Sequence, residues 1–177
     1  MSEILLAQVN RGCKMDDVSH DGKWFCDNIE QNKLDFFRFA KSILRNDDDA
    51  MDAVSEAILK AYVNLGKLRD REKFKAWMMR ILANEAYKIC NKRKRAISIE
   101  ELGEIAAIDS DSESLVLWSA IESLSKDLRA AVVLFYYDDF SIKEISKVLG
   151  ISQGAIKTRL SRAREKLRSI LSDEEDL

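Results

Sequence analysis

Apolar residues recur along this chain at the three- and four-residue spacing of amphipathic helices. Residues 29–44 are rich in aromatic and aliphatic side chains, which predicts a buried helix. The acidic run at 46–49 suits the positively polarised start of a second helix, and residues 74–89 predict a third helix beyond a polar segment. The second helix has one predicted apolar face, formed by Val54, Ile58, Ala61, Tyr62 and Leu65.

The pattern breaks at residues 96–114, where six acidic residues occur and no basic one. Such a polar stretch between periodic segments is typical of a connection between domains. Helical spacing then returns, with Ser125 as an expected helix cap. The predicted fold is therefore all-α, with two small helical domains joined by an acidic linker. Its five parts are an N-terminal extension (1–27), a first domain (28–95), the linker (96–114), a second domain (115–171) and an acidic tail (172–177).

Residues 140–164, FSIKEISKVLGISQGAIKTRLSRAR, carry the most specific local signal. Ser141 followed by Glu144 is the pattern of a capping box, and Gly150 suits the left-handed conformation that ends a helix. A second helix follows, capped by Ser152, with a buried stripe of Ile156, Leu160, Ala163 and Leu167. Two helices around a tight turn, the second one basic, are typical of a helix-turn-helix that enters the DNA major groove. The alternative is an ordinary amphipathic hairpin, but cap, turn and charge agree on DNA binding.

The exposed side of the second helix of this motif supplies candidate DNA contacts. Gln153, Lys157 and Thr158 lie near its start, where such helices reach base edges. Ser161 lies on the same side and can reach bases or phosphates. The arginines farther along favour the phosphate backbone, which positions a protein without specifying a sequence; they are Arg159, Arg162 and Arg164.

A second basic cluster ends the predicted third helix. Five cations occur in residues 88–95, and no acidic residue lies between Glu85 and the end of this cluster. Five positive charges are more than the interaction with the helix dipole explains. The cluster therefore favours contact with phosphates. The candidate contacts are Asn84, Lys88, Lys92, Arg93 and Lys94. Trp77 has the chemistry of a stacking platform for a base, but its place on the apolar stripe favours a core position.

Composition excludes several classes of protein. The 177 residues contain no proline, 34% are charged, and the net charge of −2 conceals segregated acidic and basic stretches. No apolar run approaches the ~20 residues that cross a bilayer, and the first residues lack the pattern of a signal peptide. We therefore expect a cytoplasmic protein without membrane insertion. No glycine loop for phosphate and no nucleophile motif occurs, so neither catalytic residues nor a cofactor are expected.

The cysteines and the histidine predict little chemistry. Cys13, Cys26 and Cys90 are odd in number and widely spaced, which argues against a disulfide framework. His20 is the only histidine, and its spacing from the cysteines fits no common zinc pattern. We therefore expect no metal site.

Residues 49–62 (DAMDAVSEAILKAY) and 74–84 (FKAWMMRILAN), together with the helix-turn-helix, resemble a bacterial RNA polymerase sigma factor of the sigma-70 family, extracytoplasmic-function (ECF) type. The resemblance covers nearly the whole chain from about residue 28. It implies that the first of these segments docks on the clamp helices of RNA polymerase, and that the second leads into the site for the promoter −10 element. The second domain would bind the −35 element.

The same resemblance implies a function and partners. Such an alternative sigma factor binds core RNA polymerase at its clamp helices and flap, directs promoter recognition, and initiates transcription in response to an extracytoplasmic or stress signal. Asp52, Glu56 and Lys60 would contact the clamp, and residues 64–73 would capture an unstacked −10 base. Promoter DNA is the second partner, which places the holoenzyme at the nucleoid. An anti-sigma factor, often membrane-anchored, holds such proteins inactive.

Two other functions are considered beside this one. A helix-turn-helix regulator that acts without polymerase would bind a palindromic operator tightly by itself. A sigma factor would bind DNA weakly alone and recognise its promoter only within the holoenzyme. An enzyme would need a catalytic constellation, and scattered acidic residues do not supply one.

Overall fold

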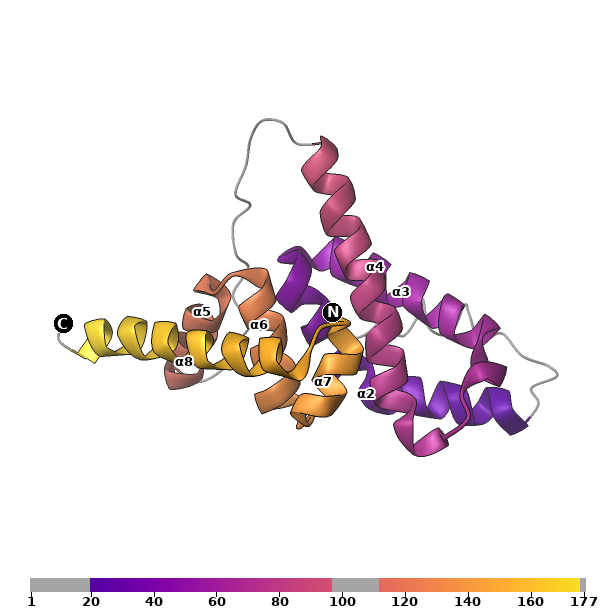
Figure 1. Cartoon of the computed structure of the whole chain (residues 1–177). Coiled ribbons are helices and arrows are strands. Elements are labelled where there is room, and N and C mark those ends of the chain that lie inside the picture. The colour runs from indigo at the N-terminus through magenta and orange to yellow at the C-terminus, as the bar shows by residue number, and fades with distance from the viewer. Residues whose placement is uncertain (1–19, 97–111, 176–177) are drawn as a thin grey trace.

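The computed structural model describes residues 20–96 and 112–175, which form helices and connecting turns without a strand (Figure 1). The all-α prediction is confirmed for these residues. Predictions for residues 1–19, for most of the acidic linker at 97–111, and for 176–177 lie outside the described residues. None of the described helices has the length and apolar character that crossing a membrane requires.

The first domain contains three long helices: α2 (His20–Leu44), α3 (Asp47–Val63) and α4 (Phe74–Ala96). Two short 3-10 turns, Leu65–Lys67 and Arg71–Lys73, connect α3 to α4. The apolar faces of the three helices meet in a core, and its most deeply buried large side chains include Phe36, Phe39, Met78, Met79 and Leu82. The three predicted helices are therefore present in the predicted order.

The start of α3 follows the prediction from the acidic run. The side chain of Asn46 accepts a hydrogen bond from the Asp49 N–H at 2.9 Å, and three aspartates occupy the first turn. The predicted apolar face is wrong at Tyr62, which is 50% exposed. The buried face is centred instead on small residues, Ala50, Ala53, Ala57 and Ala61. Their small side chains let α2 and α4 pack closely against α3.

Helix α2 begins nine residues before the helix predicted from the apolar pattern. The predicted N-terminal extension (1–27) includes residues 20–27, where Asp21 and Gly22 are poor helix formers. In the structure Phe25 is 1% exposed, and its ring meets Phe74 edge-on with centroids 5.7 Å apart. Trp24 makes a similar contact with Phe74 at 5.2 Å. Packing against α4 thus outweighs the weak local preference.

One cysteine forms a disulfide, contrary to the prediction from the sequence. Cys26 is disulfide-bonded, whereas Cys90 is a free thiol. An odd number of cysteines argues against a framework in which all of them pair. It leaves room for a single bridge, which is the case that the sequence argument overlooked.

The second domain contains α5 (Ser112–Ser123), α6 (Lys126–Val132), α7 (Ile142–Leu149) and α8 (Gln153–Glu175). Helix α5 begins inside the predicted linker, and α8 continues into the predicted tail. A π-helical turn, Val133–Tyr137, follows α6 directly and was not predicted. Ser125 occupies the N-cap of α6 as predicted, but its side chain makes no capping hydrogen bond.

The two domains pack against each other. Helices α2 and α4 contact α6, α7 and the π-helical turn, and a single apolar cluster runs through both domains. Figure 1 shows α7 lying beside α4, while α8 extends away from the first domain. Buried residues on these contacting helices include Ile43 of α2, Leu128 of α6 and Ile145 of α7.

Candidate nucleic-acid and protein interfaces

The helix-turn-helix forms from the local signals that predict it. The Ser141 hydroxyl accepts a hydrogen bond from the Glu144 N–H at 3.3 Å, and the Glu144 carboxylate accepts one from the Ser141 N–H at 2.9 Å. The Ser141 hydroxyl also donates a hydrogen bond to the Glu144 carboxylate at 2.6 Å, and this bond, followed by that of the Ser141 N–H, holds the pKa of Glu144 below its usual range. Gly150 ends α7 with φ 67°. Ser152 starts α8 by accepting a hydrogen bond from the Ala155 N–H at 3.2 Å.

Replacing Gly150 with alanine is expected to lower the free energy of unfolding by about 1–2 kcal/mol, because a Cβ at positive φ strains the backbone. No heavy atom lies within 4 Å of the Cβ position, so a steric clash with neighbouring side chains does not contribute. Gly66 is the matched control, since its Cβ position is equally open and its φ is not positive. Urea unfolding of Gly150→Ala and Gly66→Ala compares them; equal stability would contradict the assignment.

Helix α8 buries one side and exposes the other, as predicted, except that Leu167 of the predicted stripe is only half-buried. Ile156 and Ala163 are fully buried and Leu160 is 4% exposed. Six of the seven predicted contacts of α8 lie exposed on its other sides: Gln153, Lys157, Thr158, Ser161, Arg162 and Arg164. They form one polar and basic surface on the part of α8 that follows the turn.

Arg159 is the exception among these residues. It is half-buried, and its guanidinium lies 3.6 Å from the Asp127 carboxylate at the start of α6. The hydroxyl of Tyr87 on α4 donates a hydrogen bond to the same carboxylate at 3.1 Å. Burial, and next the Asp127 charge, raise the pKa of Tyr87 above its usual range. Arg159 is therefore linked, through Asp127, to the contact that Tyr87 makes between the domains.

On α4, three of the predicted phosphate contacts share one face. Asn84, Lys88 and Lys92 are exposed and follow one another at four-residue spacing. Arg93 instead forms an ion pair with Asp49 of α3 at 2.6 Å, so it braces the domain in this structure. The side chain of Lys94 lies outside the described residues.

A hollow of about 690 Å³ opens beside Asn84. It lies between the end of α3, the following 3-10 turn and α4, and is lined by Lys60, Asn64, Lys67, Trp77, Arg80, Ile81, Asn84 and Glu85. Trp77 is half-buried, so the expected core position holds in part, and it also lines this hollow. Arg80 was missed by the sequence analysis. Its position one helical turn before Asn84 was the available signal.

The exposed face of α3 carries acidic residues in its middle and apolar residues toward its C-terminal end. Asp52 and Glu56 are exposed, as the predicted protein contact requires. Lys60 pairs with Glu85 at 2.6 Å and Glu56 at 3.0 Å, and these hydrogen bonds, Glu85 first, raise its pKa. The sequence analysis missed Leu59 and Val63, which are 56% and 83% exposed. They continue the line of Asp52 and Glu56 at helical spacing, and exposed apolar area of this kind marks protein contacts.

Comparison with protein families identifies two matching regions. The family described as Sigma-70 region 2 matches residues 29–96, and that described as Sigma-70, region 4 matches residues 114–167. RNA polymerase sigma factor SigV of Bacillus subtilis (strain 168) is 31% identical over 150 residues, covering 83% of this chain and 90% of the relative. ECF RNA polymerase sigma factor SigW of the same strain is 30% identical over 167 residues, covering 84% and 89%.

Two solved structures are similar over most of the chain. The sigma factor RpoE from Bartonella quintana, in complex with the anti-sigma factor NepR, matches with a TM-score of 0.67 and 30% identity. The match covers 82% of this chain and 97% of RpoE. CnrH in complex with the cytosolic domain of CnrY has the same fold, with a TM-score of 0.60, 22% identity and 96% of both chains covered.

A region 2 helical domain followed by a region 4 helix-turn-helix defines a transcription initiation factor of the sigma-70 type. Within that class, the chain belongs to the ECF sigma factors. It is a sigma factor that binds RNA polymerase and directs it to promoters, and the alternative of a regulator independent of polymerase is not supported.

Proposed function

We propose that the work of this sigma factor is divided among three exposed helix faces. The face of α3 docks on core RNA polymerase, the face of α4 follows the −10 strand, and α8 binds the −35 element. In this proposal residues 28–95 form the domain that binds polymerase and the −10 element, and residues 115–171 form the domain that binds the −35 element. The separation of these faces, one acidic and apolar and two basic, is the observation that supports it.

On α3 the acidic pair supplies specificity and the apolar pair supplies contact area. Asp52 and Glu56 would meet basic residues of the polymerase clamp, and Leu59 and Val63 would pack beside them. Charges at the rim of an interface mainly set orientation and association rate, whereas buried apolar anchors contribute most affinity. Lys60 would join this contact after leaving its carboxylate partners.

On α4 the hollow beside Asn84 is the proposed place for an unstacked −10 base. Trp77 offers an aromatic surface, and Lys67 and Arg80 add positive charge at the same hollow. Aromatic stacking contributes about 1–3 kcal/mol per base in single-strand binding. That is of the order needed to offset taking a base out of the duplex stack. Lys88, Lys92 and Lys94 would follow the strand backbone beyond it, and Arg93 would join them after leaving Asp49.

On α8 the residues near the turn would contact bases and the later ones phosphates. Replacing Lys157 with alanine is expected to weaken binding of the native −35 sequence about 10-fold and to relax base preference. Replacing Arg162 with alanine should weaken every sequence similarly and lower the salt slope by about one. Mobility shifts of the holoenzyme over salt and promoter sequence measure both. If the two variants behaved alike, the assignment of roles along α8 would be wrong.

We also propose that an anti-sigma factor controls this protein and that an extracytoplasmic or stress signal releases it. The similar RpoE structure contains such a partner. An apolar groove of about 440 Å³ in the second domain offers a surface for such a partner. Its lining includes Leu117, Tyr136 and Leu167, together with Arg164 and Arg168. An amphipathic helix with acidic edges would fit it. In the holoenzyme the protein would be associated with the nucleoid and would perform no catalysis itself.

A further inference from the structure

In the packed arrangement, the two domains cannot bind both promoter elements at the same time. Tyr87 of α4 and Arg159 of α8 contact the same Asp127 carboxylate, at 3.1 Å and 3.6 Å. Elements centred near −10 and −35 are about 25 base pairs apart, or about 85 Å along a straight duplex. Two helices joined by one carboxylate cannot span that distance. The domains must separate before both elements are bound, and what holds them together therefore matters for activity.

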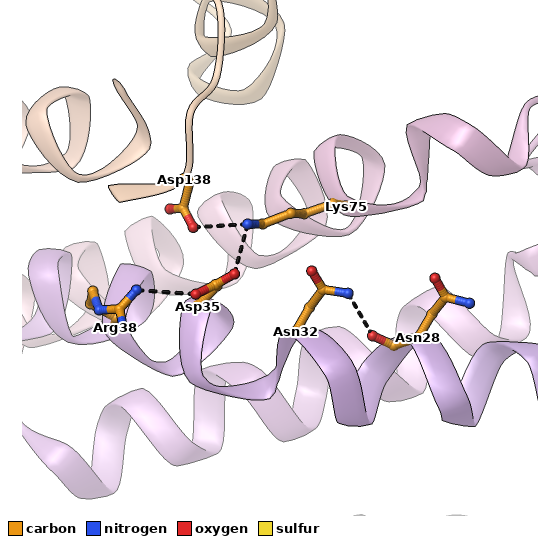
Figure 2. A network of polar contacts seen from close by, with 6 residues as sticks. All are labelled: Asn28, Asn32, Asp35, Arg38, Lys75 and Asp138. Atoms are coloured by element: carbon orange, nitrogen blue, oxygen red, sulfur yellow. Dashed lines mark hydrogen bonds and ion pairs between the residues drawn. The ribbon is translucent and has the colours of Figure 1, made fainter. Parts of the chain in front are cut away.

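A polar cluster joins the domains at the turn after the π-helical segment (Figure 2). Lys75 of α4 reaches between two carboxylates, with its Nζ 2.7 Å from Asp35 of α2 and 3.2 Å from Asp138 of the second domain. Arg38 of α2 holds the other oxygen of Asp35 at 3.0 Å. Figure 2 shows that Asp138 enters the cluster from the second domain, while the other charged groups come from the first.

Asp138 is the poorly satisfied member of this cluster. Its side chain is 0% exposed, and neither carboxylate oxygen accepts a hydrogen bond. The Lys75 ammonium lies within ion-pair distance at 3.2 Å, but it is shared with Asp35, which lies closer to it at 2.7 Å. A buried carboxylate normally needs several donors to offset the loss of water. The contact therefore contains a charge that weakens it.

We propose that Asp138 sets the balance between packed and separated domains: its buried carboxylate opposes packing, and removing the charge favours packing. The ion pair with Lys75 compensates only part of the desolvation of Asp138. When the domains separate, Asp138 returns to water and that cost is removed. The buried charge of Asp138 thus makes the contact between the domains weaker than it would be with a neutral residue at this position.

The acid–base behaviour of the cluster agrees with this sign. Burial raises the pKa of Asp138 from its usual 3.8 to about 6, against the opposing effect of Lys75. Asp138 is therefore protonated more readily in the packed state than in water, although it stays mostly ionised at neutral pH. Below about pH 4 Asp138 is neutral in both states and does not oppose packing. As the pH rises through 6, Asp138 ionises in the packed state, and the packed state becomes less stable relative to the separated one. Lys75, Arg38 and Asp35 face Asp138 from α4 and α2; burial opposes the charge of Lys75, but its carboxylate partners outweigh this and raise its pKa.

Asp138→Asn removes the charge and keeps the shape, and Asp139→Asn is its matched control. Asp139 is exposed and adjacent, and its φ of 56° suits asparagine. At pH 7.5 we expect Asp138→Asn to favour the folded, packed protein by up to about 100-fold in the unfolding equilibrium, since two pKa units correspond to that factor. The difference from wild type should shrink at pH 5.5. Asp139→Asn should behave as wild type at both pH values.

The second readout is affinity for core RNA polymerase, and its interpretation rests on the proposed function. If binding requires separated domains, their smaller population weakens apparent affinity in proportion. Asp138→Asn should therefore bind core polymerase more weakly than Asp139→Asn, by up to the same factor. Lower stability of Asp138→Asn would show that the ion pair holds the domains together and would overturn the proposal. Higher stability with unchanged affinity would overturn the link to opening. No polymerase binding by wild type would count against the proposed function, while urea unfolding would still decide the sign at Asp138.

Discussion

Replacing Arg129 with alanine is expected to lower the free energy of unfolding by about 3 kcal/mol, because two hydrogen bonds from a buried cation are lost. Arg129 is 2% exposed, and its guanidinium donates to the carbonyl oxygens of Ser42 and Glu122. These carbonyls lie at the C-terminal ends of α2 and α5, where the helix dipoles favour positive charge. One side chain thus joins the two domains through two helix ends.

Burial, and next the nearby Arg45, lower the pKa of Arg129 to about 10, so it stays charged at neutral pH. After the change to alanine, Arg45 still donates to the Glu122 carbonyl, but the Ser42 carbonyl loses this partner. A fall of about 6–12 °C in Tm is the expected size of the effect. The exposed Arg168, changed to alanine, serves as the control. A loss no larger than that of Arg168→Ala would show that the bridge contributes little.

Reversing two charges on α3 is expected to weaken binding to core RNA polymerase by about 100-fold or more. In the double variant Asp52→Lys and Glu56→Lys, the acidic face proposed to meet basic clamp residues would repel them instead. Both side chains are exposed, so the fold should keep its stability within a few tenths of a kcal/mol. Surface-immobilised core polymerase provides the measurement, at two salt concentrations because exposed charges are screened.

The matched control for that variant is the double change Asp27→Lys and Glu30→Lys on α2. These residues are also exposed, and the formal charge changes by the same amount. If the control weakened polymerase binding as much as the α3 variant, the effect would come from overall charge. The docking face would then lie elsewhere on the protein.

Sequence-based prediction succeeds here where the cause of structure is local. The capping box of Ser141 and Glu144, the left-handed Gly150 and the cap at Ser152 each depend on neighbours within a few residues. The same holds for Asn46 at the start of α3. The exposed face of α8 follows from the same periodicity, and most of its predicted contacts are accessible.

The sequence fails where structure depends on distant partners. Nothing near Arg159 or Arg93 shows that each meets an aspartate from another helix. Asp21 and Gly22 are poor helix formers and fall in the predicted N-terminal extension, yet α2 includes them because Trp24 and Phe25 pack on Phe74. The burial of Asp138 and Arg129 depends on how the domains pack. Helical periodicity within one domain carries no information about that.

Run-off transcription with purified core RNA polymerase tests the central claim most directly. The wild-type chain would be added to core enzyme on genomic promoter fragments, with the α3 charge-reversal variant and its α2 control in parallel. We expect new transcripts that depend on the wild-type chain, start downstream of shared −10 and −35 elements, and disappear only with the α3 variant. Binding to duplex DNA with no transcript and no capture of core polymerase would contradict the assignment as a sigma factor.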